Sequence, residues 1–328
     1  MDYRNFGRTG LKVSKLGLGS GGFGGVGSEP SLFGRGEDEA TAFAIMDRAL
    51  DLGINYFDTA DSYGGGRSEE IIGGWMRSRG TREQIVLSTK VFNRMGPGPN
   101  DAGLSRRHIM RAVEDSLRRL QTGWLDLYIT HEVDPWTPLD ETLGTLDGLV
   151  RQGKVRYVGA SNIEAWRLTK ALWISDRNDI ARYEGVQNEY NLLNRAIESE
   201  VLPLAEDQGL AVTPFSPLAG GFLTGKYSLE AGYPPGSRMT LRPEPYGSLL
   251  TAATFRAIDA LRAEAAQWGV SMGALALAWV HSHARVTAAL IGPRSLEHFG
   301  PAQESLQVGL TAEDRDRIVA GMEAARAP

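Results

Sequence analysis

The sequence predicts an α/β fold, a closed (β/α)8 barrel that forms a single domain over residues 1–328. Short runs of apolar and β-branched residues alternate with longer amphipathic segments along the whole chain. This alternation yields eight strand–helix units in roughly 300 residues, and the composition shows no break that would divide the chain. A doubly wound sheet remains the alternative, because alternation alone cannot distinguish a closed sheet from an open one.

The eight predicted strands are short and apolar, as expected for parallel strands that are buried on both faces. Several of them end at a polar or ionisable residue, which matters for the site considered below. In chain order the strands cover residues 13–20, 55–60, 84–90, 125–131, 155–161, 183–189, 210–216 and 286–292.

The clearest helical patterns between these strands lie at residues 37–53, 106–121 and 138–153. Their apolar residues recur at the spacing of one helix face. Pro138 suits a first helical turn, and Gly153 suits a C-terminal cap.

Two segments, residues 21–36 and 227–247, are irregular. The second is too long and too rich in proline and glycine for an ordinary connection, which indicates a functional loop. The glycines of "GLGSGG" at 17–22 match the dinucleotide fingerprint of open sheets, but that fingerprint requires a helix to follow. Because "GVGSEPSLFGRG" follows instead, the sequence disfavours a dinucleotide site of that kind.

Charge and composition exclude several classes of protein. A formal net charge of −5 gives no general attraction to nucleic acid. The chain has no cysteine, so it has no disulfides, thiolate metal sites or cysteine nucleophiles. No run reaches the roughly 18–20 apolar residues that span a bilayer, and the polar start lacks the apolar region of a secretory signal. We therefore expect a cytoplasmic protein that binds neither nucleic acid nor membranes.

No metal site is predicted. His281 and His283 flank one residue at the end of an apolar helical segment, with no carboxylate or third histidine close in sequence. Surface or capping roles are favoured for both histidines over metal binding.

Four ionisable or hydrogen-bonding side chains follow neighbouring predicted strands at their carboxyl ends. Asp58 lies near the end of the second strand, Lys90 ends the third, His131 ends the fourth, and Tyr63 follows the second. In a barrel of this kind catalytic residues gather at the carboxyl ends of the strands. Any one of these residues alone is more often structural, but four on adjacent strands indicate a catalytic site.

The chemistry that suits these groups is proton donation to an oxygen. A lysine ammonium lowers the pKa of a neighbouring phenol, so Tyr63 beside Lys90 could act as a general acid toward a carbonyl. Asp58 would keep Lys90 charged, and His131 could hold the carbonyl oxygen. A carbonyl that gains a proton on oxygen also needs a hydride on carbon, which side chains cannot supply but a nicotinamide can.

Motifs along nearly the whole chain resemble the aldo-keto reductase family, in that family's order and approximate spacing. They are "FDTADSYGGGRSEE", "STK" at 88–90, "LDLYITHEVDP", "GKVRYVGASN", "GVQNEYNLL", "FSPLAGGFLTGKY" and "LIGPRS". The resemblance implies a bacterial NADPH-dependent member related to the branch of the potassium-channel β-subunits. It also implies that Asp58, Tyr63, Lys90 and His131 are the catalytic tetrad, with Tyr63 as proton donor.

The resemblance further implies a set of residues that bind NADP(H) along its length. They are Ser20, Gly21, Asp58, Ser161, Asn162, Gln187, Phe215, Ser216, Pro217, Leu218, Gly220, Lys226, Arg238, Gly292, Arg294, Ser295 and His298.

Within this set, family roles carry over in three groups. Ser161, Asn162 and Gln187 match the hydrogen bonds to the nicotinamide carboxamide, and Phe215 matches the ring that stacks on the nicotinamide. The segment 216–220 matches the loop around the pyrophosphate, Lys226 its charged contact, and Arg238 the residue that closes over the cofactor. Gly292, Arg294 and Ser295 resemble the adenosine 2′-phosphate site. An arginine there favours NADP over NAD.

The sequence departs from the family at the adenine end. Pro301 and Ala302 stand where Glu-Asn is common, and His298 stands where a glutamine is usual. After a local shift of the chain, Gln303 or Glu304 could make the adenine contacts that Pro301 and Ala302 cannot make. Gly21 replaces a bulky residue, which would widen one wall of the substrate pocket.

Two functions follow from these residues. The first is an NADPH-dependent oxidoreductase that reduces a small-molecule aldehyde or ketone. The alternative is a cofactor-loaded binding or regulatory subunit with slow turnover, as in the channel β-subunits. The sequence leaves open the substrate, the preferred direction of reaction and the oligomeric state.

Overall fold

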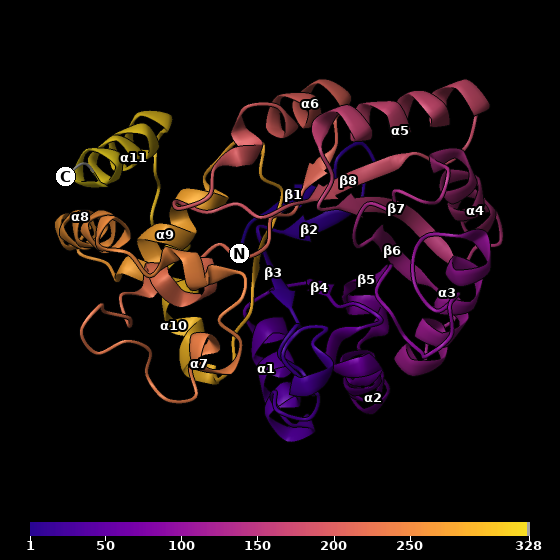
Figure 1. Ribbon diagram of the computed structural model, residues 1–328, viewed down its shortest axis with the longest axis horizontal. Helices are drawn as coiled ribbons and strands as arrows, with labels where there is room; N and C mark the ends of the chain where they lie inside the picture. Colours follow the sequence, from indigo (N-terminus) through magenta and orange to yellow (C-terminus); the bar gives the residue numbers. More distant parts are fainter. Residues whose placement is uncertain (327–328) are drawn as a thin grey trace.

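The computed structural model describes residues 1–326. Eight parallel strands form its main sheet, in the order β10-β3-β4-β5-β6-β7-β8-β9. Figure 1 shows β3 to β8 curving around a common centre, with α1 to α6 outside them. The strands are β3 (Leu16–Gly19), β4 (Tyr56–Asp58), β5 (Val86–Val91), β6 (Leu125–Thr130), β7 (Val155–Ser161), β8 (Tyr183–Gln187), β9 (Ala211–Val212) and β10 (Ala289–Ile291).

Hydrogen bonds between the two edge strands close the sheet. The Thr287 amide donates to the Val212 carbonyl at 2.7 Å, and the Leu290 amide donates to the Pro214 carbonyl at 2.9 Å. A doubly wound sheet has no such closure, so the barrel prediction is confirmed and the alternative is wrong.

One predicted strand, 13–20, is divided in the structure. Its first part is β2 (Lys12–Ser14), which pairs antiparallel with β1 (Tyr3–Asn5), and only its second part enters the barrel as β3. The chain turns at Lys15, where the Ser14 hydroxyl donates to the Leu16 carbonyl at 2.6 Å. The division arises because the first residues of the chain form a hairpin with the start of this segment.

The helices begin and end close to where the sequence places them. Asp38 caps the first predicted helix by accepting a hydrogen bond from the Thr41 amide, and Gly153 follows the third with φ 73°. Pro138 stands at the N-cap of the third helix rather than in its first turn. The helices are α1 (Glu39–Asp51), α2 (Arg67–Arg79), α3 (Arg106–Leu120), α4 (Leu139–Arg151), α5 (Ala165–Asn178), α6 (Val201–Gln208), α7 (Arg238–Leu241), α8 (Ala252–Trp268), α9 (Met272–His281), α10 (Phe299–Ser305) and α11 (Ala312–Arg326).

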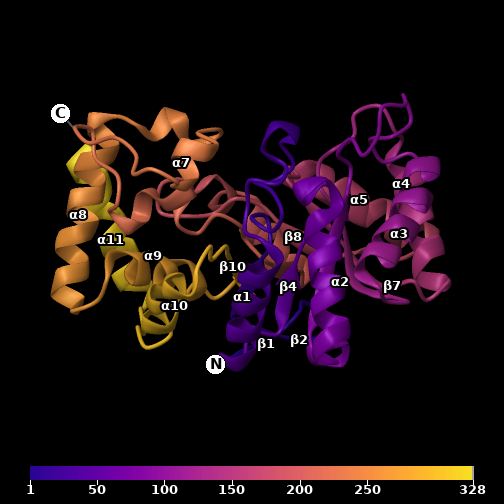
Figure 2. The same ribbon diagram turned by 90° about the horizontal axis from the view of Figure 1, so that it is seen from below.

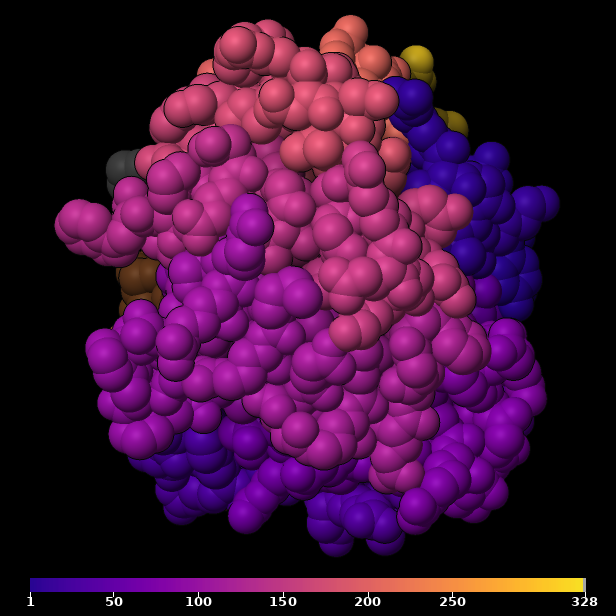
Figure 3. Space-filling model, turned by 90° about the vertical axis from the view of Figure 1, so that its right-hand side faces the viewer, coloured from indigo at the N-terminus to yellow at the C-terminus, as the bar shows by residue number. Residues whose placement is uncertain are grey.

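The last part of the chain departs from one helix per strand. Helices α7, α8 and α9 lie between β9 and β10, and α10 and α11 follow β10. Figures 1 and 2 show these helices grouped on one side of the barrel. The purple to pink segments that include α3, α4 and α5 cover the face turned toward the viewer in Figure 3. No helix within residues 1–326 is long and apolar enough to cross a membrane.

The core has two layers. The larger lies between the strands and the surrounding helices. The smaller layer includes the strand residues Tyr56, Leu127 and Leu290, together with Phe6 from the hairpin. A side chain at Gly185 would meet the Phe6 ring at 2.6 Å, so only glycine leaves room for this aromatic ring. The barrel interior is therefore packed, and its amino-terminal end is closed by the hairpin.

Candidate active site

Three of the four predicted catalytic residues meet at the carboxyl ends of β4 and β5. Lys90 Nζ lies 2.5 Å from Asp58 Oδ2, 2.8 Å from the Thr59 carbonyl and 3.4 Å from Tyr63 Oη. Lys90 is fully buried and Asp58 is 3% exposed, whereas Tyr63 is partly exposed. The buried ammonium is thus held by an anion on one side and faces the phenol on the other.

The loop after β4 positions Tyr63 through a close approach to the segment 21–36. The Gly64 amide donates to the Gly27 carbonyl at 3.0 Å. A side chain at Gly64, which has φ 59°, would lie 2.9 Å from the Phe23 carbonyl oxygen. Glycine is therefore required next to Tyr63 for both its conformation and its contacts.

Burial opposes the charges at this site, and the two groups respond differently. For Lys90, burial lowers the pKa, but the Asp58 carboxylate more than compensates, so the net pKa is raised and the ammonium stays charged. For Tyr63, burial raises the pKa and outweighs the lowering by Lys90. The sequence-based expectation that Lys90 lowers the tyrosine pKa is therefore correct for that interaction but wrong for the net shift, because burial dominates.

Asp58 is fixed by hydrogen bonds to its other oxygen. Oδ1 accepts from Ser88 Oγ at 2.7 Å and from Gln187 Nε2 at 3.1 Å. Ser88 pairs with Asp58 across β4 and β5, so the strand register itself places this donor. This role of Ser88 was not predicted. Pairing the second and third predicted strands would have placed Ser88, two residues before Lys90, opposite Asp58.

His131 directly follows β6 and faces the tyrosine. The two ring centroids are 5.7 Å apart with the planes nearly perpendicular. Burial, with a further contribution from the Lys90 charge, lowers the pKa of His131 to about 3. His131 is therefore a neutral imidazole that can donate one hydrogen bond but carries no positive charge.

The residues predicted to bind the nicotinamide end lie on β7, β8 and the segment after β9. Ser161 Oγ donates to the Gln187 carbonyl at 2.7 Å. Asn162 Nδ2 donates to the His131 carbonyl at 3.1 Å and to Glu132 Oε1 at 2.8 Å. Phe215 packs on the interior layer of the barrel. Ser161 and Gln187 thus contact each other, Gln187 contacts Asp58, and Asn162 contacts His131.

Ser20 and Gly21 stand on the other side of the tetrad. The buried Ser20 hydroxyl donates to the Asp58 carbonyl at 2.9 Å and accepts from Ser68 at 2.8 Å. A side chain built at Gly21 would approach the Tyr63 ring to 3.8 Å. Gly21 therefore leaves space directly beside the phenol of Tyr63.

The segment Ser216–Gly220 is contacted by residues 227–247, called the long loop below. Ser216 Oγ hydrogen-bonds to the Tyr246 hydroxyl. Gly220 leaves room for the Tyr246 ring, which a side chain would meet at 2.5 Å. Pro217 and Leu218 connect these two contacts, and Leu218 precedes a short 3-10 helix. The contacts of Tyr246 with Ser216 and Gly220 were not predicted from the sequence.

Four predicted cofactor residues form a basic cluster, defined here as Lys226, Arg238, Arg294 and His298. Burial lowers the pKa of Lys226, Arg238 and His298, and the charge of Arg294 lowers each of them further. The Arg294 amide donates to His298 Nδ1 at 3.0 Å. Arg238 Nη1 is buried without a hydrogen-bond partner among the described residues. Three mutually repelling cations, Lys226, Arg238 and Arg294, together with the unused donor on Arg238, suit an anionic ligand.

Arg294 forms an ion pair with the buried Glu37. Arg294 Nε donates to Glu37 Oε1 at 2.6 Å, and Nη1 donates to the Gly236 carbonyl at 2.8 Å. Glu37 is 6% exposed. Arg294 thus joins the segment before α1 to the long loop.

The remaining predictions at this end are mixed. Gly292 has open space around its α-carbon. Ser295 precedes a 3-10 helix, and its side chain makes no capping hydrogen bond there. Gln303 and Glu304 are engaged elsewhere, Gln303 with Arg48 at 3.0 Å and Glu304 with Ser271.

His283 lies two residues beyond α9 and is partly exposed, so only the predicted surface role of His281 needs correction. His281 is buried rather than at the surface, and its Nε2 contacts the Ser305 carbonyl at 3.2 Å. Helix α10 covers the end of α9, which the sequence pattern does not reveal.

Asp61 is a buried acid in the loop between β4 and Tyr63. Both carboxyl oxygens of Asp61 are buried without a hydrogen-bond partner among the described residues, and so are both ring nitrogens of His108. Asp61 and His108 line a cavity of about 240 Å³ beside Arg119. Burial, followed by the nearby Glu69 charge, raises the pKa of Asp61 well above its usual value.

Asp61→Asn is therefore expected to stabilise the protein at neutral pH. In the folded protein the carboxyl of Asp61 keeps a proton that the unfolded chain releases above about pH 4. The wild type therefore loses stability as the pH rises from about 4 toward the raised pKa of the folded state. We expect the variant to gain about 1 kcal/mol or more at pH 7. Urea unfolding at pH 7 and near pH 4 measures the difference, which should shrink at the lower pH.

The exposed Asp51→Asn is the control, and should change the unfolding free energy by less than about 0.5 kcal/mol. Equal stability of wild type and Asp61→Asn at pH 7 would contradict a raised pKa at Asp61.

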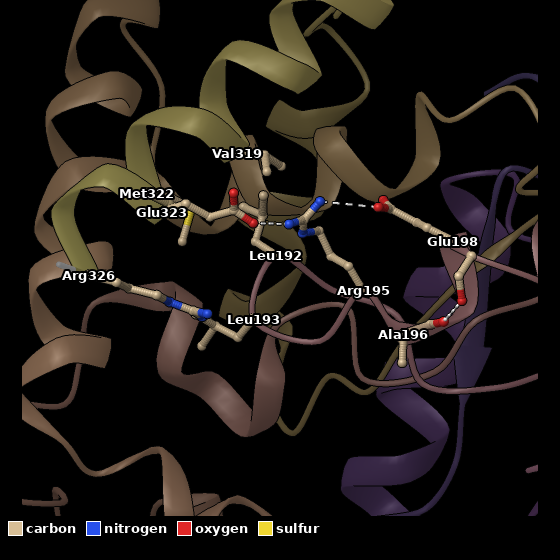
Figure 4. A pocket seen from close by; sticks show the side chains of 10 residues that line it. Leu192, Leu193, Arg195, Ala196, Glu198, Val319, Met322, Glu323 and Arg326 are labelled. Atoms are coloured by element: carbon tan, nitrogen blue, oxygen red, sulfur yellow. Dashed lines mark hydrogen bonds and ion pairs between the residues drawn. The ribbon is translucent and has the colours of Figure 1, made fainter.

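A separate groove of about 560 Å³ lies between the segment after β8 and α11. Figure 4 shows Arg195 paired with Glu198 on one side and Glu323 on the other, beside Leu192, Val319 and Met322. None of the predicted catalytic or cofactor residues lines this groove.

Comparison with known proteins agrees with this geometry. The sequence model of the aldo/keto reductase family matches residues 15–322. An "Uncharacterized oxidoreductase YrpG" of Bacillus subtilis is 40% identical over 322 residues, covering 95% of this chain and 93% of the relative. A "Probable voltage-gated potassium channel subunit beta" of Oryza sativa is 38% identical, covering 98% and 96%. A "Versiconal hemiacetal acetate reductase" of Aspergillus parasiticus is 33% identical, covering 96% and 95%.

Proposed function

This chain belongs to the aldo/keto reductase family and is an oxidoreductase, and from that premise we propose that it reduces an aldehyde or ketone to an alcohol with NADPH. Tyr63 acts as the general acid in this proposal. The observation that carries it is the position of Lys90, whose buried ammonium lies 2.5 Å from Asp58 and 3.4 Å from Tyr63 Oη.

The three groups divide the work of proton transfer. Tyr63 holds its proton at neutral pH, because its pKa is raised, and gives it to the carbonyl oxygen as negative charge develops there. Lys90 stabilises the phenolate that remains, and Asp58 keeps the lysine charged and in place. His131, as a neutral donor, holds the carbonyl oxygen near Tyr63.

The residues present fit nicotinamide adenine dinucleotide phosphate, NADP(H). The basic cluster and the unpartnered Arg238 Nη1 provide charge and donors for phosphate groups. Ser161, Asn162, Gln187 and Phe215 would hold the nicotinamide end beside the tetrad. When bound, the nicotinamide would supply the hydride that the carbonyl carbon requires.

Reduction of carbonyl compounds tests the proposal directly. The purified protein is mixed with NADPH and a panel of aldehydes, ketones, sugars and steroids, and the loss of NADPH absorbance is followed. Steady turnover with at least one reactive aldehyde is expected. If NADPH binds but no compound causes its oxidation, the reductase proposal fails.

The 38% identity to a probable potassium channel β-subunit favours a second candidate, a cofactor-loaded regulatory subunit with slow turnover. The same assay separates the two. A single slow oxidation of bound cofactor without steady turnover would favour the regulatory role.

The preference for NADPH is expected to depend on Arg294. If its guanidinium binds the 2′-phosphate, Arg294→Ala removes a charge-assisted contact of about 1.5–3 kcal/mol and weakens NADPH binding about 10–150-fold. NADH binding should be nearly unchanged. Fluorescence titration of wild type and variant with both cofactors gives the four dissociation constants.

Arg285→Ala is the matched control, since Arg285 pairs with Glu206 and lies outside the basic cluster. Equal losses for the two cofactors, or no loss for either, would remove Arg294 from the phosphate site.

A further inference from the structure

A chain of polar side chains leads from the segment 21–36 to the catalytic histidine. Asn93 follows β5 by two residues, and its Nδ2 lies 3.1 Å from Ser62 Oγ and 3.2 Å from His131 Nδ1. Ser62 Oγ in turn lies 2.7 Å from Ser28 Oγ. An amide nitrogen carries two hydrogens, so Asn93 can donate to both of these partners at once.

The contact with Asn93 determines which nitrogen of His131 carries the hydrogen. A neutral imidazole has one N–H donor and one bare nitrogen acceptor, and the hydrogen bond made by one nitrogen fixes the state of the other. The Asn93 amide nitrogen can only donate, so His131 Nδ1 must be the acceptor. The hydrogen therefore resides on Nε2.

The backbone makes this arrangement rigid. The His131 amide donates to the Val91 carbonyl at 2.9 Å, which ties the histidine to the strand that leads into Asn93. Asn162 Nδ2 donates to the His131 carbonyl from the other side. The backbone of His131 is thus fixed between the end of β5, two residues before Asn93, and the residue that follows β7.

We propose that Asn93 is a positioning residue, which holds His131 in the Nε2–H tautomer so that the imidazole can donate a hydrogen bond to the substrate oxygen. The tautomer follows from the geometry alone, whereas its use in catalysis rests on the proposed reductase function. Without Asn93, the neutral ring would be free to place its hydrogen on Nδ1, and Nε2 would then repel the oxygen that it should bind.

Nitrogen NMR of the protein with 15N-labelled histidine tests the tautomer without cofactor or substrate. The chain has five histidines, and a His131→Gln variant identifies the signal of His131 by its loss. We expect the wild type to show a protonated Nε2 and a bare Nδ1. A protonated Nδ1 in the wild type would overturn the proposal whether or not any variant folds.

Asn93→Asp supplies the second arm of the test. The aspartate has nearly the same shape but accepts where asparagine donates, so it should transfer the hydrogen of His131 to Nδ1. An unchanged Nε2–H signal in a folded variant would also overturn the proposal. Ser28→Ala is the matched control, because it cuts the far end of the polar chain and leaves the Asn93–His131 contact intact. It should leave the tautomer as in the wild type.

Kinetics then measure the consequence for catalysis. Loss of one donor to a developing oxyanion lowers kcat by about 10²–10³-fold in enzymes that depend on it, so Asn93→Asp should lower kcat by up to about that factor. The dissociation constant for NADPH should stay within about twofold, since Asn93 contacts His131 and Ser62 but no member of the basic cluster. A purely structural role would lower kcat and the melting temperature together and would raise the dissociation constant for NADPH. If the wild type reduces no carbonyl, the proposed function fails while the tautomer result still stands.

Discussion

Tyr63→Phe is expected to lower kcat by about 10²–10⁴-fold while the dissociation constant for NADPH stays nearly unchanged. The substitution removes only the hydroxyl that lies 3.4 Å from Lys90 Nζ, and with it the proton that the carbonyl oxygen requires. The ring itself, which packs against His131, remains. Initial rates with a reactive aldehyde and fluorescence titration with NADPH measure the two quantities.

Tyr3→Phe is the control for the loss of a tyrosine hydroxyl, since Tyr3 is half exposed on β1 and donates to the Gly53 carbonyl. It should retain full activity. If Tyr63→Phe kept more than about a tenth of the wild-type kcat, Tyr63 would not be the general acid.

Lys90→Met is expected to abolish most of the activity and also to destabilise the fold. Without the ammonium, the phenolate left by proton transfer loses its stabilising charge. Asp58, which is 3% exposed, loses the cation 2.5 Å away. Breaking a buried ion pair in this way costs about 3–5 kcal/mol of stability. The measurements are kcat and the free energy of unfolding in urea.

A double variant separates these two effects. Adding Asp58→Asn to Lys90→Met removes the unpaired buried charge, so most of the lost stability should return. Activity should not return, because Lys90 is still absent. Recovery of activity in the double variant would show that Lys90 acts only by balancing Asp58.

Much of the site was predictable because strand order fixes it. Asp58 ends β4, Lys90 is the last residue but one of β5, and His131 follows β6. These strands are neighbours in the sheet, so the three side chains must meet at one edge. The sequence pattern of single strands therefore carried information about contacts between strands. The same reasoning could have found Ser88, which pairs with Asp58 across β4 and β5.

Other features could not be read from the sequence, because they depend on how irregular segments pack. The Arg294–Glu37 pair joins residues 257 positions apart, and neither residue belongs to a strand. The approach of Tyr246 to Ser216 and Gly220 likewise depends on the path of a 21-residue loop, counted from 227 to 247. The net pKa of Tyr63 was mistaken for a related reason, since the depth of burial follows from the whole fold and not from the adjacent lysine.

If Arg294 binds the 2′-phosphate as proposed, its pairing with Glu37 would set a ceiling on how strongly the protein discriminates between NADPH and NADH. A phosphate that reaches this guanidinium meets an arginine whose charge is already partly neutralised by a buried carboxylate. The attraction it gains is therefore smaller than an unpaired arginine would give. In return, the carboxylate and the Gly236 carbonyl hold the guanidinium in one orientation before the phosphate arrives, which lowers the entropy lost on binding. The pairing thus weakens the charge attraction of Arg294 for a phosphate but fixes the orientation of its guanidinium before binding.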